Sequence, residues 1–368
     1  MPNTYYDILT KRGYTREEFL KFCTTVSVML GLEASSVPKI ANALETQPRL
    51  PVIYLNLQEC TCCMESFIRT AHPLLEDLLF NMISLDYSET LSVASGHAVE
   101  EARKATMRDY KNNYLVIVEG SIPVADDGIY TTIGGQSAQQ ILEETVADSI
   151  AVIAYGSCAT NTCVQGAYPN PTGARRVREI VKNKPVIDVP GCPPIAEVIT
   201  GTIVHYLTFG KIPELTNLGR PKAFYNQRIH DNCSRRSFFD AGMFVEKFDD
   251  EGHKHGWCLY KVGCKGPTTY NACAITQWNN GVSWPVKSGH PCLGCSEDNW
   301  YNDATPFYER RAIVPGMAVP HNANDVGKIV TGVTAAGVAT HALATAIIKG
   351  KEKDELNHKN NTNPENKK

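Results

Sequence analysis

The chain has 368 residues, 43% of them apolar, which is enough for two domains with a sizeable core. Its 36 Lys and Arg residues nearly balance its 39 Asp and Glu residues, so the charge gives no indication of nucleic-acid binding. The cysteines are unusual, because 12 of the 13 lie between Cys60 and Cys295 in short spacings. Disulfide frameworks are typical of small secreted domains without a core, so these spacings favour metal or cluster ligation.

Residues 1–47 have the pattern of a targeting segment. Basic residues precede a short apolar run that begins at Cys23, and Ala41-Asn42-Ala43 matches an A-x-A cleavage site. Residues 15–21 resemble a twin-arginine export signal in which Glu17 stands in place of the second arginine. The alternative is an ordinary amphipathic helix at the N-terminus. We do not expect Cys23 to be a ligand in either case.

Residues 48–226 alternate between apolar runs and helical patterns, which predicts an α/β domain with an open parallel sheet and helices on both faces. The predicted strands are 50–57, 114–119, 149–155 and 185–189, and the predicted helices are 65–82, 98–112, 137–147 and 173–182. Ligands in such folds collect beyond the carboxyl ends of the strands. The candidate ligands that end or follow these strands are Cys60, Cys62, Cys63, Glu119, Cys158, Cys163 and Cys192.

The six cysteines of this domain should therefore meet at one edge of the sheet. Four thiolates can hold either zinc or a [4Fe–4S] cluster. Zinc ribbons usually pair two close C-x₂-C knuckles on hairpins, so a site spread over several strand ends is more typical of a cluster. Six thiolates exceed the needs of zinc or an ordinary cluster, and the simplest alternative is that two are buried free thiols.

Residues 227–318 show little regular periodicity, which predicts an irregular second domain stabilised by metal ligation. A lone histidine is more often structural, but His230 lies three residues before Cys233 in a cysteine-dense region, which favours ligation. The candidate ligands form two groups: His230, Cys233, Cys258 and Cys264, and then Cys273, Cys292 and Cys295. The second group has three thiolates, which suits a cluster that lacks one iron.

Residues 329–348 contain no Asp, Glu, Lys or Arg. A helix of this length spans about 30 Å, which matches the bilayer core, so we predict a transmembrane anchor over 326–349; a buried soluble helix is the alternative. Lysines are more frequent after this run than before it, which places the tail in the cytoplasm and the main body outside. His341 is a polar group inside the run, where such groups are usually functional. The tail, 350–368, is polar and predicted to be disordered.

Six motifs in chain order resemble those of the small subunit of [NiFe] hydrogenases, and the resemblance covers about residues 10–350. They are 59–66 (ECTCCMES), 156–158 (GSC), 190–194 (PGCPP), 228–233 (RIHDNC), 261–267 (KVGCKGP) and 289–295 (GHPCLGC). The resemblance implies a flavodoxin-like first domain and three clusters in a row. It also implies that hydrogen is cleaved on a nickel–iron centre in a separate large subunit.

The resemblance assigns every candidate ligand to a cluster. The proximal cluster would be held by Cys60, Cys63, Cys158 and Cys192. The distal [4Fe–4S] cluster would be held by His230, Cys233, Cys258 and Cys264. The medial [3Fe–4S] cluster would be held by Cys273, Cys292 and Cys295, with Pro285 where a fourth cysteine could stand.

Cys62 and Cys163 resemble two added cysteines of oxygen-tolerant members of this family. In those members the proximal [4Fe–4S] cluster is replaced by a six-cysteine [4Fe–3S] cluster, which delivers two electrons in quick succession so that attacking oxygen is reduced to water. Glu119 resembles a carboxylate that ligates iron in the most oxidised state of that cluster. The alternative for Glu119 is to support the cluster ligands through hydrogen bonds or to cap a helix.

The resemblance also implies a place in the cell. The chain would be anchored in the inner membrane with its main body on the periplasmic side, although Glu17 breaks the twin-arginine pair. Electrons from hydrogen would pass to a cytochrome b that contacts the membrane helix, with His341 available for that contact, and two heterodimers would associate. The first domain also resembles a complex I subunit with adjacent cysteines, but that subunit would not need His230 or Cys292. A zinc-stabilised scaffold without redox function is the remaining alternative.

Overall fold

The structure is a computed structural model that describes residues 4–362, except for 12, 31, 47–48 and 304–322. The chain divides into two compact units, Met1–Glu309 and Arg310–Lys368. The predicted domain boundary at 47–48, the end of the predicted second domain (304–318) and the end of the tail (363–368) lie outside the described residues.

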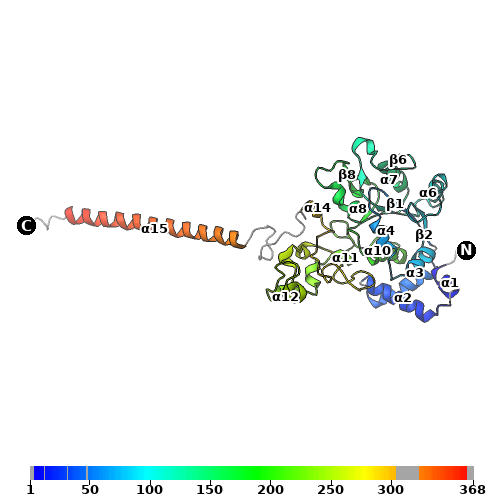
Figure 1. The fold of residues 1–368 in the computed structure, drawn as a ribbon, viewed down its shortest axis with the longest axis horizontal. Coiled ribbons are helices and arrows are strands. Elements are labelled where there is room, and N and C mark those ends of the chain that lie inside the picture. Colours follow the sequence, from blue (N-terminus) through cyan, green and yellow to red (C-terminus); the bar gives the residue numbers. More distant parts are fainter. Residues whose placement is uncertain (1–3, 12, 31, 47–48, 304–322, 363–368) are drawn as a thin grey trace, which may run out of the picture. The chain divides into compact units, whose positions relative to one another are not determined.

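A five-stranded parallel sheet forms the centre of the first unit, and its strand order is β2-β1-β3-β7-β9. Figure 1 labels two of its paired strands, β1 and β2. Its strands are β1 (Leu50–Asn56), β2 (Ile83–Ser88), β3 (Leu115–Glu119), β7 (Val152–Tyr155) and β9 (Val186–Val189). All residues of β1, β3, β7 and β9 are buried, as expected for a parallel sheet covered on both faces. The predicted α/β parallel sheet and its four predicted strands are confirmed, and β2 is an addition.

Two clusters of buried side chains occupy the two faces of this sheet. Helices α6 (His97–Asp109), α7 (Ala138–Val146) and α9 (Val177–Ile180) contribute to one cluster, and α4 (Cys62–Phe67) and α10 (Ala196–Phe209) to the other. Short pairs of strands, β4 (Ile122–Pro123) with β8 (Ala174–Arg175) and β5 (Thr132–Ile133) with β6 (Gln136–Ser137), lie in the connections.

Two predicted helices are shorter than expected. The pattern over 65–82 is not one helix, because α4 ends at Phe67 and the chain resumes as α5 (Leu75–Asp77) and a π-helical turn, Leu78–Met82. Pro73 lies in the break. A proline there interrupts the helix because it lacks the N–H that a continuous helix needs. The pattern over 173–182 retains only α9 as a helix.

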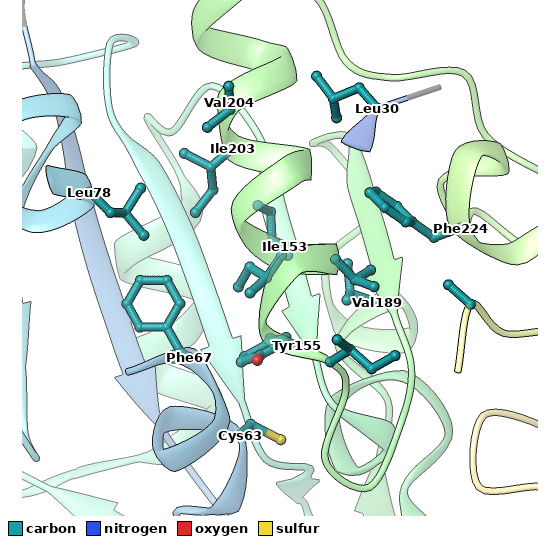
Figure 2. Packing of buried hydrophobic residues seen from close by; sticks show 14 of the residues in the cluster. Leu30, Cys63, Phe67, Leu78, Ile153, Tyr155, Val189, Ile203, Val204 and Phe224 are labelled. Atoms are coloured by element: carbon teal, nitrogen blue, oxygen red, sulfur yellow. The ribbon is translucent and has the colours of Figure 1, made fainter. Parts of the chain in front are cut away.

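The packed core reaches the cysteines at the edge of the sheet. Figure 2 shows α10 lying along the sheet, with Ile203 and Val204 on the same side of the sheet as Ile153. Phe67 and Tyr155 belong to the same cluster and lie close to Cys63, which is itself only 6% exposed. Cys63 therefore stands on the packed core of the sheet.

Three helices precede the sheet: α1 (Tyr5–Lys11), α2 (Arg16–Met29) and α3 (Val37–Thr46). Phe19, Cys23 and Ile40 are completely or almost completely buried in the cluster that contains α10, and α3 packs against α10. Ala41 and Ala43, the predicted cleavage pattern, lie buried within α3. This packing is what the amphipathic-helix alternative predicts, and the targeting role stays a prediction.

The described residues 227–303 contain only short helical turns and no strand longer than an isolated bridge. They follow α11 (Lys222–Tyr225) and include α12 (Arg236–Asp240), α13 (Glu251–Lys254), α14 (Trp300–Asp303) and the 3-10 turns Ile229–Asn232, Tyr260–Val262 and Gly266–Thr268. The region is as irregular as the sequence predicts.

The second unit contains the helix α15 (Ala323–Thr362). Its part from Gly327 to Glu355 is long and apolar enough to cross a membrane. Thr331, Thr334, Thr340 and Thr345 donate hydrogen bonds to backbone carbonyls one turn earlier, so their hydroxyls need no partner outside the helix. The disorder predicted for the start of the tail is wrong, since the helix continues to Thr362 through good helix formers such as Lys and Glu.

Candidate functional site

Six cysteines meet where the strands of the sheet end. Cys60, Cys62, Cys63, Cys158 and Cys192 line one pocket together with Glu59 and Glu119. The sixth, Cys163, has its Sγ 3.9 Å from the Sγ of Cys192. The loops after β1, β7 and β9 thus bring together all six cysteines that the sequence predicts for this edge.

Glycines make this close approach of the loops feasible. Gly156 has a φ of +93°, and a Cβ built on it would lie 2.3 Å from the Sγ of Cys63. Gly120 has a φ of +101°, and its Cβ would lie 2.8 Å from the backbone of Gln58. A side chain at either position would push apart the segments that carry the cysteines.

The chemistry of the pocket suits a positively charged iron centre. Burial raises the pKa of the Cys63 thiol well above its usual value and that of Cys60 to about 12. Bound metal cations favour the thiolate and offset this cost of burial. No Lys or Arg is among the described residues that line the pocket, so its own side chains supply no competing cation. The donor set therefore fits an iron–sulfur cluster.

Two carboxylates lie beside these thiols. Glu119 is 1% exposed and accepts hydrogen bonds from the backbone N–H groups of Cys63 and Met64, at 2.9 and 3.0 Å, and from the hydroxyl of Tyr54 at 2.8 Å. It therefore acts as the cap of α4, the second of the two roles the sequence leaves open. Burial raises the pKa of Glu119. Burial, followed by the charge of Glu119, raises the pKa of Glu59 to about 7.

A second group of candidate ligands lies in the irregular region. Three of these thiols, those of Cys233, Cys258 and Cys264, are close enough to influence one another electrostatically. All three also influence the guanidinium of Arg235. This guanidinium donates a hydrogen bond to the Trp257 carbonyl at 2.7 Å. His230 lies on the same turn as Cys233, and its ring packs edge-on against Phe239 at 4.5 Å between centroids. Burial lowers the pKa of His230, which favours the neutral imidazole that binds metals.

The third group consists of Cys273, Cys292 and Cys295. Cys273 and Cys292 are buried and Cys295 is half-buried. Burial, followed by the charges of the other two cysteines, raises the pKa of the Cys273 thiol well above its usual value. The structure therefore brings this predicted set together as well. Among the described residues, no three His, Cys, Asp or Glu side chains form a site for a single metal ion.

Two residues of the site have no role that the sequence alone predicts. Glu59 and Ser157 both occur in motifs, but their positions become informative only in the fold. Glu59 faces Glu119, and Ser157 contacts the backbone of Cys295, which lies 138 positions further along the chain. Only their position next to a cysteine could have drawn attention to them.

Comparison with known proteins places the chain in a family. Residues 225–308 match the family model for the C-terminal part of the NiFe/NiFeSe hydrogenase small subunit. Residues 60–206 match the model for the 20 kDa subunit of NADH ubiquinone oxidoreductase. The sheet with its thiols and the irregular cysteine-rich region are thus each known parts of redox proteins.

Relatives that match over nearly the full length of the chain identify the family more specifically. The chain is 52% identical to the uptake hydrogenase small subunit of Azotobacter vinelandii over 344 residues, which are 94% of this chain and 96% of the relative. It is 50% identical to that of Cupriavidus necator over 96% of this chain and 98% of the relative. The structure matches the crystal structure of a reduced, active NiFeSe hydrogenase from Desulfomicrobium baculatum, with a TM-score of 0.67 and 30% identity over 72% of this chain and 100% of that chain. The chain belongs to the family of uptake hydrogenase small subunits, so the resemblance of the six motifs is confirmed.

Proposed function

We propose that the chain is the electron-transfer subunit of a membrane-bound [NiFe] uptake hydrogenase and holds three iron–sulfur clusters in a row. The observation that carries the proposal is the gathering of twelve cysteines into three groups. Cys292 of the third group donates its N–H to the sulfur of Cys264 in the second, and Cys295 lies near Cys192 of the first. The six at the sheet edge would hold the proximal cluster. Cys273, Cys292 and Cys295 would hold the medial cluster, and His230, Cys233, Cys258 and Cys264 would hold the distal cluster.

The chain's own part is to hold and insulate these centres. Iron–sulfur clusters supply one-electron transfer at potentials that burial and hydrogen bonds to sulfur adjust. Hydrogen cleavage belongs to the nickel–iron centre of a large subunit. Cys60, Cys62 and Cys192 lie on the open side of the pocket. Val164 and Tyr168 follow Cys163 and are 59% and 92% exposed, which supports this side as the surface that meets the large subunit.

We infer that the proximal cluster is of the six-cysteine [4Fe–3S] type and that the enzyme is oxygen-tolerant. Cys62 and Cys163 both lie at this site, and neither is set apart as an isolated free thiol. In the described conformation Glu119 is engaged as the cap of α4. A role for Glu119 as an iron ligand would therefore require its carboxylate to exchange these hydrogen bonds for iron.

The test uses the purified heterodimer. Iron and sulfide analysis with EPR titration should give three clusters and two successive one-electron steps at the proximal cluster. A double variant, Cys62→Gly with Cys163→Gly, should retain hydrogen:dye activity under argon, lose one of the two steps and lose activity in air. Full activity of this variant in air would overturn the oxygen-tolerance proposal, whereas zinc without sulfide in the wild type would overturn the whole assignment.

The membrane arrangement is part of the same proposal. The apolar helix α15 would anchor the chain in the inner membrane and meet a cytochrome b that accepts the electrons, with His341 available for that contact. Lys349, Lys351 and Lys353 follow the apolar stretch, which supports a cytoplasmic tail and a periplasmic main body. Two heterodimers would associate in the complex. Protease protection in intact cells and spheroplasts tests the predicted side.

A further inference from the structure

Neighbouring groups of cysteines lie against one another at two junctions. At the first, Cys192 of the sheet-edge group lies close enough to Cys295 of the third group for their charges to interact. The backbone N–H of Cys292, in the third group, donates to the Sγ of Cys264, in the second group, at 3.3 Å. At both junctions, therefore, a candidate ligand of one group lies next to a candidate ligand of another group.

The two junctions differ in what holds them. At the junction of Cys292 with Cys264, the backbone supports itself, because the N–H of Lys265 donates back to the Cys292 carbonyl at 2.7 Å. The junction of Cys192 with Cys295 joins segments from different parts of the fold. It depends on a side chain, the hydroxyl of Ser157.

Ser157 is 1% exposed and bonds to both sides of this junction. Its hydroxyl accepts a hydrogen bond from the N–H of Gly191 at 3.0 Å and donates one to the carbonyl of Cys295. Its own N–H donates to the Gly191 carbonyl at 2.8 Å. Gly191 immediately precedes Cys192, so Ser157 ties the backbone beside Cys192 to the backbone carbonyl of Cys295.

A second contact reinforces the junction one turn further along α8 (Ser157–Asn161). The side-chain amide of Asn161 donates to the Glu297 carbonyl at 3.0 Å, and its oxygen accepts from the N–H of Cys163 at 3.3 Å. Both Ser157 and Asn161 therefore connect the short helix after β7 to the segment that follows Cys292. Their hydrogen bonds are shielded from water, and this shielding strengthens them.

We propose that Ser157 is a positioning residue for electron transfer, which holds the backbone beside Cys192 against Cys295 so that electrons would pass from the first cluster to the second across this junction. The proposal rests on the proposed function. One electron would leave the first centre and enter the second, while no covalent bond is formed or broken and no proton moves. Hydrogen oxidation in the large subunit supplies the electrons.

The test compares heterodimers by rapid-freeze EPR after oxidised enzyme is mixed with hydrogen. Ser157→Ala should keep the iron and sulfide content of the wild type, weaken the magnetic coupling between the first and second clusters, and slow reduction of the second cluster several-fold. Ser157→Thr keeps the hydroxyl and should restore both properties. Ser296→Ala is the matched control, because Ser296 is also buried beside Cys295 but donates to Tyr270 within its own region at 3.1 Å.

Wild-type coupling and reduction rate in a fully loaded Ser157→Ala enzyme would overturn the proposal, as would equal effects of Ser296→Ala. If Ser157→Ala loses iron, the Asn161→Asp variant tests the proposal instead. This substitution keeps the acceptor for the N–H of Cys163 and removes the donor to the Glu297 carbonyl. It should then slow the same step, and a wild-type rate would count against the proposal. Failure of the proposed function looks different, since the wild-type enzyme itself would lack the cluster signals.

Discussion

Gly156 marks the tightest packing of backbone against a candidate ligand. The loop after β7 turns there with a φ of +93°, so a side chain would be strained as well as crowded. The space that a Cβ would need is taken by the sulfur of Cys63, at 2.3 Å. Because Cys63 is buried on the core shown in Figure 2, its sulfur has little room to retreat.

Gly156→Ala should therefore displace Cys63 and remove the proximal cluster, while the other two clusters remain. The measured iron content should fall by the amount that one cluster holds, and the proximal EPR signal should be absent. Gly135→Ala is the control, since Gly135 also has a positive φ, +83°, but nothing lies within 4 Å of its added Cβ. It should carry only a backbone cost of roughly 1–2 kcal/mol. A Gly156→Ala enzyme with its full iron content would contradict the prediction.

Residue identity and spacing were sufficient to predict the candidate ligands, because thiols that follow successive parallel strands must meet at one sheet edge. The roles of Ser157 and Glu119 could not be predicted in the same way. A serine or glutamate has many uses, and the partners that define these two, the Cys295 carbonyl and the N–H groups of α4, depend on the folded chain.

The residues at the start of α2, Glu17 among them, favour a folded helix. Thr15 and Glu18 form a complete capping box, and Glu17 pairs with Lys21 at 2.8 Å one turn along. Acidic residues in a first turn also complement the helix dipole. The glutamate that interrupts the twin-arginine pattern thus lies where the N-terminus of a stable helix benefits from it.

We predict that the mature protein retains α2 and α3. Their removal would uncover the apolar side of α10 that Ile40 and its neighbours bury. Intact-mass measurement of the small subunit from purified complex should give an N-terminus before Thr15. A mature N-terminus immediately after Ala43 would show instead that this segment is removed as a leader. The burial of Ala43 within α3 argues for retention, since a protease needs an extended substrate.

The elements that sequence analysis missed have physical reasons. Strand β2 reads Ile-Ser-Leu-Asp-Tyr-Ser and lies at the edge of the sheet, so its pattern is half polar and lacks the continuous apolar run of a central strand. The apolar spacing over 65–82 predicts one helix, yet Pro73 divides it. Central strands were predictable because burial on both faces leaves a plain apolar run.

The two halves of the main unit differ in what stabilises them. The sheet is held by long-range packing on both faces, whereas residues 227–303 consist of short turns around buried cysteines. Ligation would replace regular structure as the source of stability there, and metal binding energy then becomes folding energy. The thiols of Cys258 and Cys264, whose pKa values burial raises to about 12, would otherwise remain protonated.

Removal of iron should therefore unfold this region before the sheet. Limited proteolysis of chain produced without cluster assembly should cut first within 227–303 and leave 50–206 protected, as peptide mass mapping can show. The loaded heterodimer, treated identically, should resist in both regions. Equal protection of both regions in the iron-free chain would mean that packing alone stabilises the second region.

Helix α15 exposes apolar side chains, whereas the core of the main unit buries them. Val338, Leu343 and Ile347 are each at least 60% exposed. The hydroxyls of Thr331, Thr334, Thr340 and Thr345 are bonded to the backbone of the helix itself. An apolar helix with satisfied polar groups suits lipid. Deletion of 326–368 should therefore release the heterodimer from the membrane fraction, keep hydrogen:dye activity and abolish hydrogen-dependent reduction of the membrane quinone.

A single substitution tests the same helix without removing it. Val338→Lys places a charge near the middle of the apolar stretch, at a cost of about 3 kcal/mol for insertion, and should shift part of the enzyme to the soluble fraction. Val338→Leu keeps the position apolar and should remain in the membrane. Since the candidate cluster ligands lie in the other unit, both variants should have wild-type iron content and dye activity. Retention of the lysine variant at the wild-type level, even after a carbonate wash, would mean that a partner subunit rather than α15 holds the enzyme at the membrane.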